Sequence, residues 1–321
     1  MQLFRSATEI RRTIMRELKI IYRSESHAPF WVLAERAGIW ENHDLRVNTS
    51  PELGRERAVE ALKNGHVDLI SGNHHNLYAR RAKNREDFVH LAQLGNRWTE
   101  NHLIVTDAIK SVQDLRGKQI AVDSKNSHAG LNVWLFMRQE GLDLDKGDYN
   151  FVETHASTDK RCKGVLAGEF DAAFVDLPHN LRALREGAQE ITVRPMPMIR
   201  GVTLTTTMAW VKSHEEETRL LIRGTVEAVH FFLTQPEKTK HIMKESTILG
   251  LHNDGEADAL YDSWSSFLER KLYPTTEAIN NVFALAARLK PEIADLNPLV
   301  MWNTHYLREL DDSGFIDNLY R

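Results

Sequence analysis

The feature that most constrains the fold is a regular alternation of short apolar strands with amphipathic helices at the start of the chain. Strand patterns at residues 18–22, 45–48 and 67–71 are separated by helical patterns at 29–37 and 55–64. The run at 67–71 is typical of a strand that is covered on both faces. Because parallel strands need a crossover rather than a tight turn, this succession predicts an α/β domain with a mainly parallel sheet.

The alternation continues and then restarts. A helix at 77–83 and strands at 88–94 and 102–105 extend the first unit. Beyond Ser111 a second series begins. Its strands are expected at 119–122, 150–153 and 172–176, and its helices at 129–140, 159–166 and 181–186. After residues 195–207 the pattern changes to long helices such as 217–233, which predicts a helical C-terminal extension.

An internal echo links the two units. The sequence DLISGNHHNL at 68–77 follows a glycine at position 65, and DAAFVDLPHNL at 171–181 follows a glycine at 168. Both stretches run from a helix end through a strand and a polar loop into His-Asn-Leu. If the match is not chance, both loops lie at the carboxyl end of a strand, which is where open α/β sheets bind ligands.

Composition excludes several classes of partner. The chain has 321 residues and a formal net charge of −4, which disfavours binding to nucleic acid or to an anionic membrane surface. No apolar run approaches the ~20 residues of a membrane span. The single cysteine, Cys162, rules out an internal disulfide and any site with several thiolates. We expect Cys162, which lies within a predicted helix, to be structural.

The N-terminal residues bear on location. Residues 1–17 predict a short basic helical arm, and Met15 is an alternative start. Residues 1–30 contain no apolar core of a secretory signal, so the chain as written is expected to be cytoplasmic. If the N-terminus is not native, a periplasmic location is the alternative.

Five segments in order carry a resemblance to a known family. They are HAPFWVLAERAGIW at 27–40, the strand at 65–72, VQDLRGKQIAV at 112–122, the stretch at 168–178, and MAWVK at 208–212. In this order they resemble the type II periplasmic-binding-protein superfamily. The nearest branch holds sulfonate-, taurine- and nitrate-binding proteins and thiamine-pyrimidine-precursor synthases.

The resemblance implies a two-lobed α/β fold with the ligand clamped between the lobes. The chain would cross between lobes near Val105 and near Thr205. Residues 18–105 and 206–321 would then form lobe 1 with the C-terminal helices, and residues 106–205 would form lobe 2. The implied function is binding of a small anionic ligand, which we expect to be aromatic or heteroaromatic, with a transporter permease as partner if the protein is exported.

A cytosolic enzyme on the same scaffold is the alternative, either an aromatic-acid decarboxylase or another lyase or hydrolase. The many histidines and the missing export signal favour it. In that case His27, His74 and His128 would supply acid and base, since an unperturbed imidazole titrates near neutrality. The nucleophilic cysteine of the family's desulfinase and the cysteine cluster of its pyrimidine synthases have no counterpart in this chain.

Four polar loops at the predicted cleft edge each contain a histidine. The candidate ligand-binding residues are Ser24, His27, Phe30, Asn73, His74, His75, Ser127, His128, Asp176 and His179. Ser127 precedes a predicted helix, so it either caps that helix or helps to seat an acid group at the positive helix end. For His74 and His75 there are two interpretations: they are imidazoles that are buried in the core or solvated, or they donate hydrogen bonds to a ligand. Because adjacent side chains point in different directions, only one of the two is expected to face the cleft. His179 is the expected counterpart of His75 across the gap.

Other chemistries lack a pattern. No HExxH-type or cysteine-rich spacing supports a metal site, and no Walker loop, GxGxxG or G-x-S-x-G motif is present. The sequence therefore predicts neither a metal nor a cofactor. Trp98 and Trp134 could stack on a planar ligand, although aromatic residues in such positions more often belong to the core.

Overall fold

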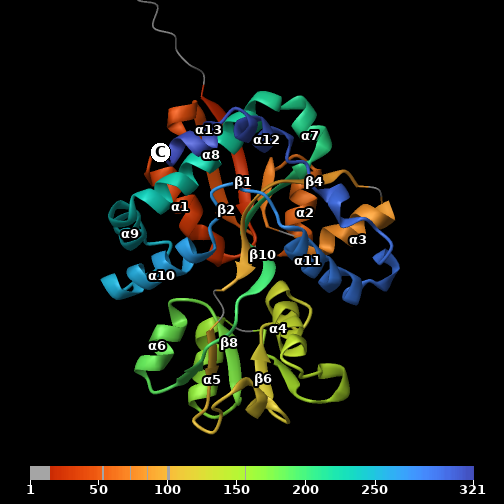
Figure 1. The fold of residues 1–321 in the computed structure, drawn as a ribbon, viewed down its shortest axis with the longest axis vertical. Coiled ribbons are helices and arrows are strands. Elements are labelled where there is room, and N and C mark those ends of the chain that lie inside the picture. The colour runs from red at the N-terminus through yellow and green to blue at the C-terminus, as the bar shows by residue number, and fades with distance from the viewer. Residues whose placement is uncertain (1–14, 53, 73, 85, 100–101, 156) are drawn as a thin grey trace, which may run out of the picture.

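The computed structural model describes residues 15–321, except 53, 73, 85, 100, 101 and 156. Two five-stranded sheets, each flanked by helices, form an upper and a lower lobe (Figure 1). The predicted basic arm at 1–14 lies outside the described residues. Residues 16 and 17, which we assigned to that arm, belong to the first strand.

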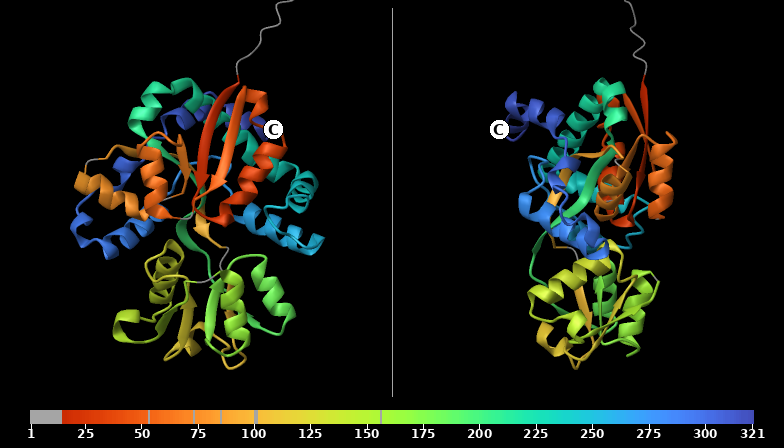
Figure 2. Two further views of the ribbon diagram at one scale, coloured as in Figure 1. Left: turned by 180° about the vertical axis from the view of Figure 1, so that it is seen from behind. Right: turned by 90° about the vertical axis from the view of Figure 1, so that its right-hand side faces the viewer.

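The first sheet has the order β2-β1-β3-β10-β4. Its strands are β1 (Arg16–Tyr22), β2 (Leu45–Pro51), β3 (Leu69–Ser71), β4 (Phe88–Trp98) and β10 (Met196–Thr207). The first three are parallel, whereas β10 is antiparallel to both β3 and β4. Figure 2 shows helices on both faces of this sheet.

The second sheet has the order β7-β6-β8-β5-β9. Its strands are β5 (His102–Val105), β6 (Gln119–Val122), β7 (Asn150–Glu153), β8 (Ala172–Val175) and β9 (Gln189–Ile191). Here too β5 is antiparallel to its two neighbours, so four strands of each sheet point one way and the fifth, β10 or β5, points the other way. Each sheet is mixed but mainly parallel in strand direction, as the sequence predicted. The strand that runs against the others is the one by which the chain enters each lobe from the other lobe, β10 in the first and β5 in the second.

The helices of the two α/β series fall where the sequence placed them. In the first lobe they are α1 (Ala28–Arg36), α2 (Arg55–Lys63) and α3 (His75–Asn84). In the second lobe they are α4 (His128–Gln139), α5 (Thr158–Leu166) and α6 (His179–Arg185). Short 3₁₀ turns connect them, namely η1 (Glu25–His27), η2 (Glu41–His43), η3 (Val112–Leu115) and η4 (Leu144–Lys146).

The C-terminal third is helical and covers the first lobe (Figure 1). Its helices are α7 (Met208–Ser213), α8 (Glu215–Thr234), α9 (Pro236–Lys244), α10 (Asp254–Phe267), α11 (Thr276–Leu289), α12 (His305–Asp312) and α13 (Phe315–Leu319). Two further 3₁₀ turns are η5 (Pro291–Ile293) and η6 (Pro298–Met301). Among the described residues, none of the helices is long and apolar enough to span a membrane.

The crossings between lobes lie elsewhere than predicted. Strand β5 pairs in the second sheet, so the first crossing lies between Trp98 and His102 and not near Val105. Strand β10 pairs in the first sheet from Met196 onward, so the return crossing lies at residues 192–195 and not near Thr205. The error arises because β5 and β10 read in sequence as parts of one lobe, whereas each pairs with strands of the other lobe.

The internal echo has the same structural meaning in both lobes. Gly65 and Gly168 end helices α2 and α5 with φ of 67° and 70°, a conformation that favours glycine. Asp68 then accepts a 2.7 Å hydrogen bond from the backbone N of Lys19, and Asp171 accepts a 2.9 Å bond from the backbone N of Gln119. Each aspartate thereby ties its own strand to the neighbouring parallel strand.

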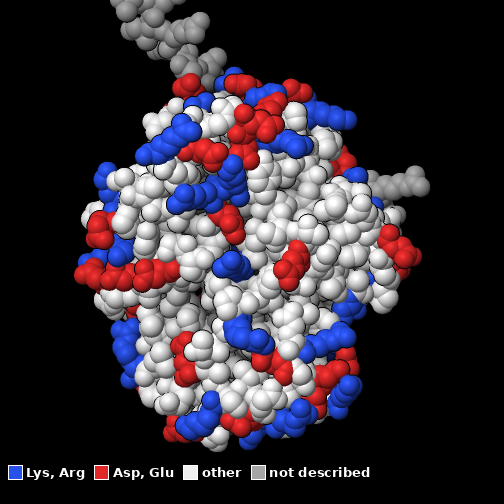
Figure 3. Space-filling model, viewed as in Figure 1, with Lys and Arg blue, Asp and Glu red and all other residues white. Residues whose placement is uncertain are grey.

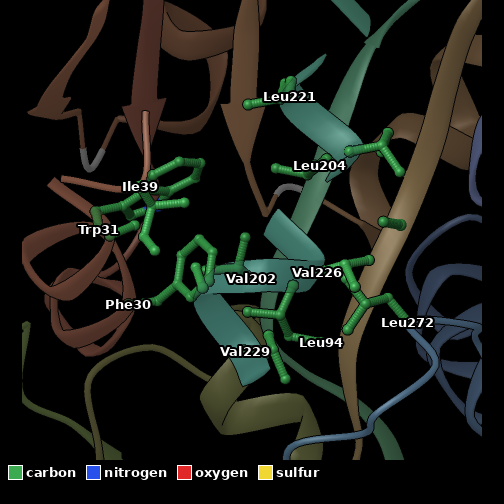
Figure 4. Packing of buried hydrophobic residues seen from close by; sticks show 14 of the residues in the cluster. Phe30, Trp31, Ile39, Leu94, Val202, Leu204, Leu221, Val226, Val229 and Leu272 are labelled. Atoms are coloured by element: carbon green, nitrogen blue, oxygen red, sulfur yellow. The ribbon is translucent and has the colours of Figure 1, made fainter. Parts of the chain in front are cut away.

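The first lobe has an aromatic core between α1, α8 and the sheet (Figure 4). Phe30 and Trp31 pack edge to face, with ring centroids 5.1 Å apart, and both side chains are fully buried. Phe30 therefore belongs to the core, and our assignment of it as a ligand-binding residue is wrong. Trp98 and Trp134 are also core residues; Trp98 packs on Phe174 of the second lobe at 5.5 Å.

Candidate functional site

The candidate site lies between the lobes, where the carboxyl ends of the parallel strands of both sheets meet (Figure 1). From the first lobe come the turn after β1 and the turn after β3. From the second lobe come the loop between β6 and α4 and the loop between β8 and α6. Ligands of open α/β sheets bind at this edge, so the position agrees with the prediction from sequence.

Five histidines converge there, and we call them the histidine cluster: His27, His74, His75, His90 and His128. The His128 ring, at the start of α4 in the second lobe, lies 5.6 Å from the ring of His74 and stacks at 5.7 Å on that of His75. His90, on β4, lies 5.8 Å from His74. Both adjacent histidines thus contact the other lobe, and the prediction that only one would do so is wrong.

Hydrogen bonds anchor the cluster to the first lobe. His27 Nδ1 lies 3.2 Å from the Ser71 carbonyl and 3.0 Å from its hydroxyl, which also accepts a 3.1 Å bond from Trp31 Nε1. His90 Nδ1 bonds to the Thr205 hydroxyl at 2.9 Å, and His74 Nε2 bonds to the Thr203 hydroxyl. Since β10 carries both threonines, the strand that returns from the second lobe orients the histidines.

Burial keeps these imidazoles neutral. It lowers the pKa of His27 to about 3, with Arg200 adding to the effect, and that of His90 to about 3. Burial and then Arg55 lower the pKa of His128 to about 4, against a contribution from the Ile199 carbonyl that raises it. The pKa values of His74 and His75 are also lowered, by burial and then by His128. At pH 7 the cluster therefore offers neutral donors and acceptors.

Three arginines surround the cluster, and the sequence analysis missed all of them. Arg200, on β10, has a side chain that is only 13% exposed, and burial lowers its pKa to about 9. Burial also lowers the pKa of Arg23 to about 10 and that of Arg55 below its usual value. All three remain cations at pH 7. His90 was missed as well, because it lies within a strand that sequence alone assigns to the core.

Of the described carboxylates near these cations, Glu52 and Glu56 are themselves paired with Arg57 and Arg80, which leaves Asp123 and Asp176. Asp176 Oδ1 lies 3.9 Å from Arg200 Nη2, and burial raises the pKa of Asp176. Asp123 accepts a 2.6 Å hydrogen bond from the Ser127 hydroxyl. Over the surface seen in Figure 3, by contrast, charges of both signs are interspersed. The interior of the cleft thus carries positive charge although the whole chain is acidic, an arrangement suited to an anion.

Ser127 caps helix α4, as one of the two interpretations predicted. Its hydroxyl oxygen accepts a 3.0 Å bond from the backbone N of Gly130, and the same hydroxyl approaches Asp123 and the Ser124 carbonyl. The hydroxyl is thus engaged within the protein. Ser24 similarly caps η1, where it accepts from the backbone N of Ser26.

His179 does not join the histidine cluster, so its predicted pairing with His75 across the gap is wrong. It lies with Asp176 in a separate pocket of about 140 Å³ that Glu25 and Trp264 also line. Burial and then Arg182 lower its pKa. Asn73 lies outside the described residues. Within the described part of the chain, no three or more histidine, cysteine or carboxylate side chains are arranged to hold a metal ion.

Polar contacts join the lobes on both sides of the cleft. Arg55 donates a 3.1 Å hydrogen bond to the carbonyl of Asn126 in the second lobe. Arg288 of α11 binds Asp145 with two contacts of 2.9 Å. On the other side Arg182 and Arg185 of α6 bind Glu256 of α10 at 2.8 and 2.7 Å. The structure therefore describes the lobes in contact, with the histidine cluster enclosed.

A comparison with family models gives one match. Residues 39–194 match the family described as ABC transporter, phosphonate, periplasmic substrate-binding protein. No curated protein matches the chain.

Solved structures match over nearly the whole chain. The periplasmic aliphatic sulphonate binding protein SsuA from Escherichia coli is 18% identical, with a TM-score of 0.67, covering 90% of this chain and 92% of its own. A putative periplasmic sulfonate-binding protein SsuA from Methylobacillus flagellatus KT is also 18% identical, with a TM-score of 0.69 and coverages of 94% and 97%. The periplasmic nitrate-binding protein NrtA from Synechocystis PCC 6803 is 10% identical, with a TM-score of 0.64 and coverages of 93% and 89%.

At such identities the structural likeness shows the fold, two lobes joined by two crossings. The residues that match the family model include strands β2, β3 and β4 of the first sheet and all five strands of the second sheet. Both findings agree with the fold that the resemblance in the sequence implied: the chain has the two-lobed fold of these periplasmic binding proteins.

Proposed function

We propose that this protein binds a small organic anion in the cleft between its lobes and releases it when the lobes open. The observation that carries the proposal is the set of three arginine cations around five neutral, buried histidines. Cations in a site shielded from water attract an anion more strongly than exposed ones do. Neutral imidazoles next to them add directional hydrogen bonds to the ligand without repelling the arginines.

The two crossings supply the motion. Opening of the lobes would separate His128 from His74 and His75, because His128 belongs to the second lobe and the other two belong to the first. A ligand that contacts both sides of the cleft stabilises the closed state by its differential affinity for the two states.

A membrane permease is the proposed partner. The matched family is described as periplasmic and as part of an ABC transporter. We therefore propose a periplasmic location and delivery of the anion to a permease. The depressed pKa values of His27 and His128 argue against the alternative of a cytosolic enzyme, since a general base works best with a pKa near the operating pH.

The ligand's chemistry can be tested directly. Thermal unfolding would be measured with methylphosphonate, methanesulfonate, nitrate, benzoate and phenylphosphonate, because a ligand that binds only the folded state raises the melting temperature. Isothermal titration would give affinities for those that do. We expect at least one organic anion to bind, and Arg200→Gln to abolish binding. Ultraviolet spectra recorded with the aromatic acids would reveal any turnover.

The matched control is Arg116→Gln, which removes an arginine paired with Asp148 on the surface of the second lobe. It should leave binding unchanged. Equal loss of binding in both variants, or no shift with any anion in the native protein, would contradict the proposal.

A further inference from the structure

A second cavity adjoins the histidine cluster on the outer side of the first lobe. It lies between helices α2 and α3 and the C-terminal helix α11, and its volume is about 620 Å³. We call it the α3–α11 pocket. Its apolar wall consists of Ala79, Ala82, Ala286, Leu289 and Ile293.

The pocket shares two lining residues with the candidate site. His75 and Arg55 line it, and the His75 ring also stacks on His128 of the cluster. A molecule bound at His75 can therefore extend into the pocket without passing through the protein core.

The inner end of the pocket holds polar atoms that lack partners. Arg55 Nη1 lies 3.4 Å from His75 Nε2, and because a guanidinium only donates, this nitrogen of His75 accepts. The proton of the neutral ring is then on Nδ1, which is buried and has no hydrogen-bond partner among the described residues. His75 itself is 4% exposed.

Asn76 shows the same feature. Both its amide nitrogen and its amide oxygen are buried without a partner in the described part of the chain, and Asn76 also lines the pocket. A buried polar group without a hydrogen bond costs ~1–3 kcal/mol, so three such atoms at one end of a cavity indicate that a bound molecule supplies the partners.

The charges at this end favour an acid group. Arg55 is the cation next to His75 and Asn76. Of the two carboxylates that line the pocket, Glu56 is paired with Arg80 at 2.7 Å, and the other, Glu292, follows the end of α11 beside Lys290. An acid group at the inner end would therefore meet one cation and two N–H donors.

The size of the cavity determines how large the rest of the ligand can be. Sites for small organic ligands typically enclose ~300–1,000 Å³, and this pocket lies in that range. Nitrate or a phosphonate group alone would leave most of it unfilled, with the apolar wall in contact with water.

We propose that the α3–α11 pocket takes the apolar body of the ligand, an aryl group or an alkyl chain of several carbons, while Arg55, His75 and Asn76 hold its acid group. The inference rests on the proposed function and specifies its substrate class as amphipathic organic acids.

The test compares anions that share a head group. Affinities of the native protein for methylphosphonate, phenylphosphonate and octylphosphonate are measured by isothermal titration. We expect phenylphosphonate or octylphosphonate to bind at least tenfold more tightly than methylphosphonate. Whichever of these two has the higher affinity shows whether the pocket prefers a flat aryl group or a flexible alkyl chain.

Ala82→Trp is the filling variant, because Ala82 is exposed at the pocket and the larger side chain can occupy it without entering the core. It should keep the affinity for methylphosphonate and reduce the tenfold gain to less than twofold. The matched control, Ala209→Trp, changes another exposed alanine on α7 and should preserve the gain. Asn76→Asp places a negative charge at the inner end and should weaken all three ligands by a similar factor.

Two results would overturn the inference alone: methylphosphonate binding with no gain from a larger body, or a gain that survives Ala82→Trp. Unchanged affinities in Asn76→Asp would contradict the placement of the acid group. If none of the three phosphonates binds although another anion of the wider panel does, the inference fails alone; if no anion of either set binds, the proposed function fails with it.

Discussion

The Glu256 carboxylate of α10 accepts a 2.8 Å hydrogen bond from Nη2 of Arg182, which lies on α6 in the other lobe. Arg185 adds a second contact, of 2.7 Å. Glu256 is 1% exposed. Burial by itself would raise its pKa, but the hydrogen bonds from Arg182, from the backbone N of His252 and from Arg185 outweigh it and lower the pKa to about 2. A helix of the C-terminal extension thus fastens the lobes together next to the cleft.

We expect Glu256→Gln to favour the open form. Removing one partner of a buried ion pair costs ~3–5 kcal/mol when the other charge stays buried, but Arg182 and Arg185 are 27% and 56% exposed and stay hydrated, so we expect a smaller cost, on the order of 1–2 kcal/mol. Small-angle X-ray scattering should show a larger radius of gyration, and ligand affinity should fall. The control Glu237→Gln, at an exposed position on α9, should change neither. Unchanged scattering in Glu256→Gln would show that this ion pair does not hold the lobes closed.

Acid should weaken the folded state through the histidine cluster. His27, His90 and His128 have folded pKa values of about 3, 3 and 4, against 6.5 for an unperturbed imidazole. Below pH 6.5 the unfolded chain therefore binds protons that the folded chain does not. Stability is fully present above pH 6.5 and falls as the pH drops toward 4, by up to ~1.4 kcal/mol per pH unit for each histidine.

Urea unfolding between pH 7 and 4.5 measures this slope. His90→Asn removes one imidazole whose pKa is lowered by burial. The dependence of the unfolding free energy on pH should therefore become less steep by the contribution of one histidine. His66→Asn, at an exposed position, is the control and should leave the slope as it is. A native protein equally stable at pH 7 and 4.5 would show that these histidines are not neutral in the folded state.

A buried relay fixes the tautomer of His74. Gln93 Nε2 donates to the carbonyls of Gly95 at 2.7 Å and Arg200 at 2.5 Å, so its oxygen faces the Thr203 hydroxyl and accepts from it. That hydroxyl has one hydrogen, and it must therefore accept from His74 Nε2. We expect nitrogen NMR to find the His74 proton on Nε2, which leaves Nδ1 as an acceptor.

Thr203→Val removes this relay while conserving shape. It leaves the His74 and Gln93 groups without a partner at a fully buried position, so we expect a loss of ~1–3 kcal/mol in the free energy of unfolding. Thr239→Val is the matched control, because Thr239 is equally buried and its hydroxyl has no hydrogen-bond partner among the described residues. Its stability should stay the same or rise. Equal losses in the two variants would contradict the relay.

The loop that carries His128 depends on Gly130. A Cβ added to Gly130 would lie 2.1 Å from the Ser124 carbonyl oxygen, which is backbone and cannot rotate away. Gly130→Ala should therefore displace the loop at residues 124–127, cost ~1–3 kcal/mol of stability and weaken anion binding. Gly255→Ala, whose Cβ would meet only the Asn253 side chain at 3.3 Å, should change stability by less than about 0.5 kcal/mol. Native-like affinity in Gly130→Ala would show that the loop does not need this close approach.

Much of the fold could be predicted from the sequence because the relevant signals are local. Apolar periodicity, helix-ending glycines and the spacing of Gly65 to Asp68 and Gly168 to Asp171 act over a few residues, and they placed the helices and the parallel strands. The crossings were misplaced because β5 and β10 pair antiparallel with strands distant in sequence. Apolar periodicity identifies a strand but does not specify its partner.

The site was predicted in part for the same reason. Loops at strand ends pointed to His27, His74, His75 and His128, since their position follows from chain order. Arg55, Arg200 and His90 were missed because they lie within a helix or a strand. The sequence of such an element does not show whether a polar side chain points to solvent or into the cleft. Phe30 and His179 were assigned to the ligand although Phe30 packs in the core and His179 lines another pocket.

By itself the sequence determined a two-lobed α/β protein with histidines at the ligand-binding edge, because secondary structure and crossover geometry follow from local patterns. Only the tertiary structure decided which side chains meet there. The positive interior of an acidic chain, the neutral state of the histidines and the α3–α11 pocket all arise from contacts between segments that are far apart in sequence. Burial and charge proximity, which set the pKa values and the affinity for an anion, are properties of those contacts.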